Sequence, residues 1–183
     1  MLLRINIYKR MSLLVIAYPQ LEEKDYSWIQ AFRSKYDERY FKVVEPHFTF
    51  VFPDFNTDKD EFIKHVQHVA KKFKEFYFVL RCAQIVKDSF SDYTDVFLIP
   101  EEGYRLFVKL HDALYSGILE KELRLDIPFI PHIGIANNLD AKKCKLLADE
   151  INTLNLEIVG AVSKLEIITY EESKVKTIKQ IYL

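Results

Sequence analysis

The stretch "IPFIPHIGIAN", residues 127–137, repeats the pattern of "VVEPHFTFVFP", residues 43–53. Each places Pro-His inside an apolar run rich in β-branched or aromatic residues, which is typical of a β-strand. The two histidines, His47 and His132, are 85 residues apart. We therefore expect two strands that carry these histidines at equivalent places in the fold.

The first segment predicts which face of its strand carries the histidine. Side chains alternate between the faces of a strand, so the phenylalanines at every second residue share one face: Phe48, Phe50 and Phe52. Three aromatic residues in this phase belong in a core. His47, Thr49 and Val51 are then expected on the opposite face.

The second segment follows the same rule. Ile133 and Ile135 are predicted to point into the core, whereas His132, Gly134 and Ala136 share the other face. If the two strands belong to halves related by a pseudo-twofold axis, both histidines face one central cleft.

Two histidines in one cleft suit phosphoester chemistry. One imidazole can take a proton from the attacking oxygen while the other gives a proton to the leaving oxygen. The ordinary pKa of histidine lies near neutrality, so it can perform both tasks. The Thr49 hydroxyl could hydrogen-bond a non-bridging phosphate oxygen, where charge develops. This scheme requires no metal.

The remaining periodicities also repeat. They predict the succession strand, helix, histidine strand, helix, strand twice, starting near residues 12 and 93. Thr57 and Asp60 form a capping-box arrangement that predicts the start of one helix. The predicted helices cover about 21–40, 57–73, 101–119 and 140–151, and the other predicted strands about 12–18, 76–87, 93–99, 155–169 and 175–182.

We therefore expect one α+β domain over residues 1–183. It is bilobal, with two pseudo-symmetric halves at about 12–92 and 93–183, antiparallel sheets lining a central cleft, and helices outside. Arg4, Lys9 and Arg10 precede an apolar run that is too short for a signal peptide. Residues 1–10 are treated as an extension before Met11, which is an alternative start.

Composition narrows the classes of partner. Lys and Arg number 26 against 27 Asp and Glu, so the chain lacks the basic excess that holds long nucleic acid, whereas a short phosphate-bearing ligand is compatible. The sequence lacks a run of 18 apolar residues, which predicts no membrane span. Cys82 and Cys144 lack metal-type spacing, and we expect reduced thiols in a cytoplasmic, monomeric protein.

The other histidines are predicted to have no catalytic role. His65 and His68 lie one helical turn apart near Glu61, and His111 lies beside Asp112. Each is expected on the solvated face of an amphipathic helix rather than in a metal site. Nucleophile-elbow, P-loop and H-E-x-x-H motifs are also missing from the sequence.

At the two histidine segments the sequence resembles the two-histidine phosphoesterases, which include the 2'-5' RNA ligase-like proteins and the cyclic phosphodiesterases. The resemblance rests on two His-x-[Ser/Thr]-x motifs on strands, here HFTF at residues 47–50 and HIGI at residues 132–135. A Lys-Tyr-Asp stretch at residues 35–37 is similar to one in a subgroup of small bacterial members. The resemblance covers about residues 12–183 and implies the bilobal fold.

The resemblance also implies an activity. Family members act on 2',3'-cyclic phosphates of nucleotides or RNA ends, or on 2'-5' linkages, without a metal or other cofactor. His47 and His132 would form the acid–base pair and Thr49 would bind phosphate. The natural substrate, the direction of reaction and the histidine that acts as acid stay open.

Gly134 departs from the family pattern, which has Ser or Thr there. One hydroxyl donor is missing, so we expect weaker phosphate binding and lowered or redirected activity, unless a neighbouring donor or the accessible glycine amide compensates. An alternative is a binding module that holds RNA ends or a phosphorylated metabolite without turnover. In a third interpretation the repeated motif is accidental and the protein is structural.

Overall fold

Two antiparallel sheets form the framework of residues 12–183, the part of the chain that the computed structural model describes. The four-stranded sheet has the order β3 (Phe48–Asp54), β1 (Leu13–Ala17), β8 (Lys164–Glu171) and β9 (Lys174–Tyr182). The five-stranded sheet has the order β2 (Gln20–Leu21), β7 (Ile158–Val162), β4 (Phe76–Lys87), β5 (Thr94–Glu102) and β6 (Ile133–Asn138). The predicted extension 1–10 and alternative start Met11 lie outside the described residues.

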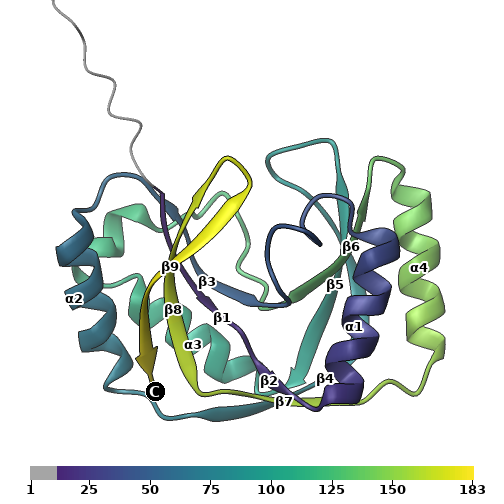
Figure 1. Cartoon of the computed structure of the whole chain (residues 1–183), viewed down its shortest axis with the longest axis horizontal. Coiled ribbons are helices and arrows are strands. Elements are labelled where there is room, and N and C mark those ends of the chain that lie inside the picture. Colours follow the sequence, from purple (N-terminus) through teal and green to yellow (C-terminus); the bar gives the residue numbers. More distant parts are fainter. Residues whose placement is uncertain (1–11) are drawn as a thin grey trace, which may run out of the picture.

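The helices cover the outer side of each sheet (Figure 1). In the lobe of the five-stranded sheet they are α1 (Glu23–Tyr36) and α4 (Ala141–Thr153). In the other lobe they are α2 (Lys59–Ala70), α3 (Tyr104–Leu114) and the 3-10 helix η1 (Gly117–Glu122). The predicted bilobal α+β fold with helices outside is confirmed. In the described part of the chain, every helix is too short or too polar to cross a membrane.

The two lobes do not coincide with the sequence halves 12–92 and 93–183. The first half contributes β4 to the five-stranded sheet, where it pairs with β5. The second half contributes β8 to the four-stranded sheet, where it pairs with β1. Each half thus completes the sheet of the other, because the open edges of β1 and β5 can pair with a strand from anywhere in the chain. The two histidine strands occupy equivalent places, because β3 is an edge strand of the four-stranded sheet and β6 is an edge strand of the five-stranded sheet.

Phenylalanines fill the core behind the four-stranded sheet. The ring of Phe107 on α3 lies 4.4 Å from that of Phe48 and 5.8 Å from that of Phe50, centroid to centroid. Phe76 and Phe78 of β4 approach the same ring edge-on at 5.0 and 5.7 Å. All five are buried, so the core predicted for Phe48 and Phe50 is confirmed.

Phe52 is an exception to the predicted alternation. It is half-buried and lines the cavity between the lobes, whereas Val51 is fully buried. The pairing of β3 with β1 shifts register twice, on either side of the Val15–Val51 pair. A bulge changes the phase of the alternation, which explains why the prediction for Phe52 and Val51 was wrong.

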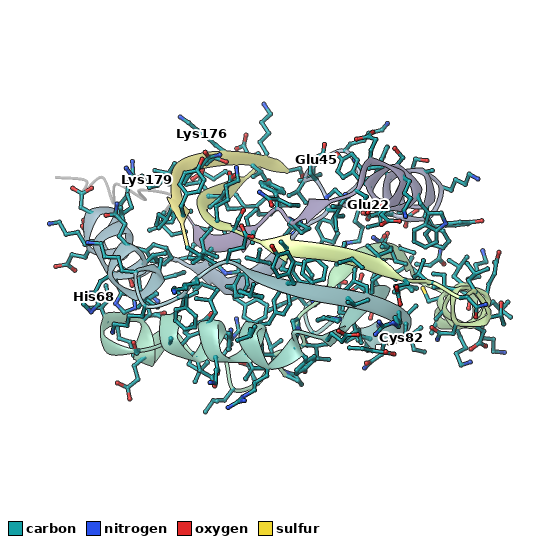
Figure 2. All side chains as sticks on the ribbon, turned by 90° about the horizontal axis from the view of Figure 1, so that it is seen from below. Glu22, Glu45, His68, Cys82, Lys176 and Lys179 are labelled. Carbon is teal, nitrogen blue, oxygen red and sulfur yellow. The ribbon has the colours of Figure 1, made fainter. Side chains whose placement is uncertain are left out.

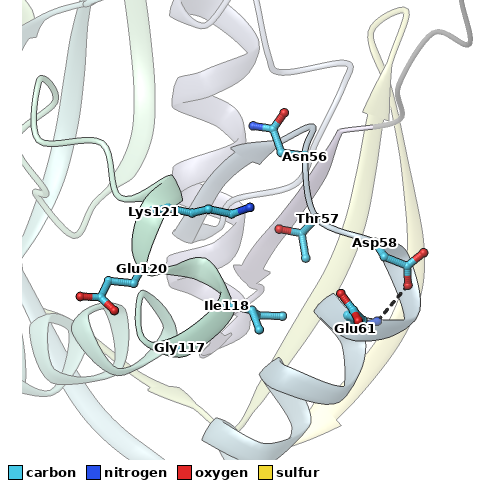
Figure 3. A pocket seen from close by; sticks show the side chains of 8 residues that line it. All are labelled: Asn56, Thr57, Asp58, Glu61, Gly117, Ile118, Glu120 and Lys121. Atoms are coloured by element: carbon cyan, nitrogen blue, oxygen red, sulfur yellow. Dashed lines mark hydrogen bonds between the residues drawn. The ribbon is translucent and has the colours of Figure 1, made fainter.

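Two further elements differ from the sequence prediction. The segment 155–169 is not one strand, because the chain leaves the five-stranded sheet after Val162 and enters the four-stranded sheet at Lys164. Helix α2 is capped by Asp58 rather than Thr57. The Asp58 carboxylate accepts the backbone N–H of Asp60 at 2.9 Å and that of Glu61 at 3.2 Å, and the bond to Glu61 is drawn in Figure 3.

Candidate active site

A cavity of about 460 Å³ lies between the two lobes. Side chains of β1, β3 and β8 line one side, and side chains of β4, β5 and β6 line the other. The four residues singled out from the sequence all line it: His47, Thr49, His132 and Gly134. The two histidine segments, far apart in the chain, therefore meet in one place.

Both imidazoles are held in the same way. His47 Nδ1 donates to the carbonyl of Glu45 at 2.8 Å, and His132 Nδ1 donates to the carbonyl of Ile130 at 2.6 Å. A carbonyl only accepts, so Nδ1 carries the hydrogen in both rings and Nε2 is left for a ligand. The intervening Pro46 and Pro131 fix the backbone angle that turns each carbonyl toward its ring.

Burial shifts both histidines toward the neutral form. It lowers the pKa of His132 to about 4, against the raising effect of the hydrogen bond to Ile130, and the charge of His47 lowers it further. Burial also lowers the pKa of His47, with the Glu45 hydrogen bond opposing it. His132 stacks on Phe97, with ring centroids 3.5 Å apart, whereas His47 meets the edge of Tyr18 at 6.3 Å. The two histidines thus have similar hydrogen bonds but unequal surroundings.

Gly134 leaves open space beside His132. A Cβ built at this residue would have Phe97 Cε1, at 4.0 Å, as its nearest neighbour, and Phe97 is also its cross-strand partner. The backbone therefore does not require glycine here. The missing hydroxyl is a difference in chemistry between the two strands, not a consequence of crowding.

A buried polar network in the wall of the cavity connects the two histidine segments. Arg33 and Asp37 form an ion pair at 2.9 Å, with both side chains at most 3% exposed. Arg33 donates to the carbonyl of Val44 at 2.8 Å, three residues before His47. Asn137, on the strand that follows His132, donates to Asp37. We call Arg33, Asp37 and Asn137 the buried clamp.

The sequence analysis missed the buried clamp. Arg33 and Asp37 follow Ile29 at intervals of four residues, so they continue the apolar face of α1 that also carries Phe32. An oppositely charged pair spaced four apart on such a face was the available signal. Nothing local to these residues indicated that Asn137 completes the network.

The remaining histidines are not gathered at the cavity. His68 is exposed on α2, as predicted (Figure 2), and half-buried His65 has its Nε2 2.8 Å from the carbonyl of Leu114. The prediction for His111 was wrong, because it is 4% exposed, bonds the Phe50 carbonyl through Nδ1 at 2.9 Å and stacks on Phe129. The partners of His111 come from distant segments, which a helical periodicity does not reveal.

A second hollow lies where α2 begins, beside η1 (Figure 3). Acidic and small polar residues dominate its lining, which includes Asp58, Glu61 and Glu120. It contains none of the predicted site residues and no histidine. Neither cysteine lines either of these two cavities: both are free thiols, and buried Cys144 donates to the Thr94 carbonyl at 3.1 Å.

Comparison with known proteins identifies the family of the chain. A family model described as the 2'-5' RNA ligase superfamily matches residues 20–174. A Bacillus licheniformis protein named "Putative phosphoesterase" is 29% identical over 126 residues, which cover 68% of this chain and 70% of that protein.

Solved structures show the same fold at low sequence identity. E. coli LigT complexed with 3'-AMP has a TM-score of 0.55 and 14% identity, covering 95% of this chain and 98% of LigT. Kluyveromyces marxianus Usb1 with uridine monophosphate has a TM-score of 0.51 and 10% identity, covering 93% and 98%. Since the family model spans most of the chain, the protein belongs to the 2'-5' RNA ligase superfamily, as its resemblance to the two-histidine phosphoesterases predicts.

Proposed function

We propose that the protein is a metal-independent phosphodiesterase that uses His47 and His132 as its acid–base pair. The substrate is a 2',3'-cyclic phosphate of a nucleotide or short RNA end, or a 2'-5' phosphodiester linkage. The observation that carries this proposal is the matched pair of imidazoles in one cavity, each with Nδ1 fixed by a backbone carbonyl. Family membership supports the phosphoesterase class, and LigT and Usb1 were solved with nucleotides bound.

The reaction divides between the two rings. A neutral imidazole accepts a proton from water through Nε2 as the water oxygen attacks phosphorus. The protonated imidazole gives its Nε2 proton to the ribose oxygen as the bond from phosphorus to that oxygen breaks. The product is a phosphomonoester with a free ribose hydroxyl. Run toward ligation, the same groups exchange roles.

We assign the acid to His47 and the base to His132. A charge on His47 lowers the pKa of His132, so the pair disfavours two protons at once and one ring is neutral when the other is charged. The stacked ring of Phe97 keeps His132 in an apolar setting that favours the neutral form. His132 is thereby kept ready to accept a proton at neutral pH.

Thr49 is the proposed phosphate ligand. It precedes the bulge in β3 and lines the cavity, so its hydroxyl can donate to a non-bridging oxygen. On the other strand Gly134 stands at the corresponding position, and β6 has no Ser or Thr to supply a hydroxyl. Weaker phosphate binding on the His132 side follows from this asymmetry.

The test is turnover of 2',3'-cyclic mononucleotides in excess EDTA. Wild type is compared with His47→Ala and His132→Ala, and His68→Ala serves as a control because His68 is exposed on α2. Removing an acid–base group should lower the rate on the order of 10²–10⁴-fold. Full activity in either site variant, or loss of activity in EDTA, would overturn the proposed mechanism.

A binding module is the second candidate function. The specific observation in its favour is Gly134, which removes one of the two hydroxyl donors of the family pattern. It predicts that 3'-AMP binds while no cyclic nucleotide or 2'-5' linkage is turned over. Calorimetry with 3'-AMP therefore separates the two functions.

A further inference from the structure

The end of the cavity formed by β5 and β6 contains an unpaired carboxylate. Asp95 lines the cavity, yet within residues 12–183 its side chain accepts no hydrogen bond and forms no ion pair. Its acidic neighbour Asp88 is by contrast fully engaged, by Arg39 at 2.7 Å, by Ser91 and by the backbone N–H of Phe90. The half-buried Asp95 carboxylate is therefore available to accept hydrogen bonds from a ligand in the cavity.

The surroundings of Asp95 disfavour the charged form of its carboxylate. Burial raises the pKa of Asp95 to about 6, and the negative charges of Asp88 and Asp37 act in the same direction. Arg39 and Lys87 oppose this effect only through their charges. A group that donates hydrogen bonds into this end of the cavity would therefore stabilise the charged carboxylate.

A second acceptor lies directly across the sheet. Asn137 is the cross-strand partner of Asp95, is 4% exposed and lines the same cavity. Its amide N–H₂ faces the Asp37 carboxylate, which only accepts, so the amide oxygen is turned the other way. That oxygen has no hydrogen-bond donor among the described residues. Half-buried Asp95 thus lines the cavity next to a second acceptor, the Asn137 oxygen, which is buried in the wall.

The distance from the histidines fits a nucleoside. Asp95 precedes Phe97 by two residues on β5, so the two side chains share a face with Cα atoms about 7 Å apart. Phe97 stacks on His132. A phosphate held between His47 and His132 therefore leaves its nucleoside room to extend toward Asp95, and the cavity volume of about 460 Å³ lies in the range of small-molecule sites.

We propose that Asp95, with Asn137 beside it in the wall, forms a base-recognition subsite that selects a nucleotide whose base presents an exocyclic amino group. An amino group donates N–H to the Asp95 carboxylate, whereas a carbonyl at the same place would face that carboxylate with no donor between them. Cytosine and uracil differ in this way at C4, where cytosine has an amino group and uracil a carbonyl oxygen. This subsite rests on the proposed function, because it takes the cavity to hold a nucleotide.

The experiment compares cytidine and uridine 2',3'-cyclic phosphates in wild type and Asp95→Asn. We expect wild type to prefer the cytidine substrate in kcat/KM by on the order of tenfold or more. The side-chain amide introduced by Asp95→Asn can turn either its oxygen or its N–H₂ to the base, so the preference should fall to about threefold or less. Asp92→Asn, an exposed residue of the β4–β5 connection that does not line the cavity, removes the same charge and should keep the wild-type preference.

A binding measurement separates this subsite from the proposed reaction. Calorimetry with 3'-CMP and 3'-UMP reads base preference without turnover. If neither cyclic nucleotide is hydrolysed but 3'-CMP binds more tightly than 3'-UMP and Asp95→Asn removes the difference, the subsite stands and the proposed reaction falls. Equal binding of the two nucleotides by wild type, binding of neither, or a preference that survives in folded Asp95→Asn overturns the subsite.

Discussion

Breaking the buried clamp should destabilise the whole domain. In Asp37→Ala the guanidinium of Arg33 stays 2% exposed but loses the carboxylate that contacts it at 2.9 Å through both Nε and Nη2. The backbone N–H of Tyr40, 3.0 Å from Asp37 Oδ1, and the amide of Asn137 lose their acceptor as well. Removing one partner of a buried ion pair costs about 3–5 kcal/mol, because an uncompensated charge remains.

That loss is large enough to measure easily. For a chain of this length 1 kcal/mol shifts Tm by about 2–4 °C, so Asp37→Ala should lower Tm by about 6–20 °C. Urea unfolding followed by far-UV circular dichroism gives the free energy of unfolding. Fluorescence of Trp28, the one tryptophan in the sequence, reports on α1 in the same samples.

A double variant tests the pairwise origin of the effect. Arg33→Met should be costly for the same reason, since it leaves Asp37 buried without its cation. Arg33→Met combined with Asp37→Leu removes both charges and should cost less than the sum of the two single replacements. Single variants within about 1 kcal/mol of wild type, or strictly additive effects, would refute the assignment of this pair as a stabilising link between the histidine segments.

Three further outcomes follow from the site and the fold. The pKa of His132 in the folded protein, about 4, lies below its ordinary value of 6.5. The free energy of unfolding should therefore be highest above pH 6.5 and fall by up to about 3 kcal/mol toward pH 4. Urea unfolding measured across this pH range should show a smaller pH dependence in His132→Gln. Gly103→Ala should lower the free energy of unfolding by at least about 1–2 kcal/mol, because φ is +83° and the new Cβ would lie 2.5 Å from the Tyr77 carbonyl oxygen. Gly134→Ala is the matched control: its Cβ meets only Phe97, at 4.0 Å, so the free energy of unfolding should change little. Gly134→Ser should bind 3'-AMP more tightly than wild type in calorimetry, and unchanged affinity would show that the missing hydroxyl has no role at this position.

Local patterns were sufficient for the elements and for the histidine pair. The repeated Pro-His segments, the alternating phenylalanines and the amphipathic helices depend on side chains within a few residues of one another, so their periodicity appears in the sequence. The faces of β6 followed directly: Ile133 and Ile135 are buried, and His132 and Gly134 line the cavity. These predictions needed no knowledge of which strands pair.

Strand bulges, strand breaks and contacts between distant segments could not be predicted in the same way. The bulges that turn Phe52 into the cavity depend on how β3 pairs with β1. The strand expected at 155–169 is interrupted after Val162 because β7 pairs in the five-stranded sheet whereas β8 pairs in the four-stranded sheet. His111 is buried because α3 packs against β3, which brings the Phe50 carbonyl within 2.9 Å.

By itself the sequence determined an α+β chain with two equivalent histidine strands and the chemistry that two imidazoles can perform. Only the tertiary structure decided that β4 and β8 exchange between the halves, that Arg33, Asp37 and Asn137 join the two histidine segments, and that Asp95 and Asn137 face one another across β5 and β6. The physical reason is the range of the interactions. Periodicity records contacts within a strand or helix, whereas buried ion pairs and unsatisfied acceptors arise between residues that are close only after the sheets have assembled.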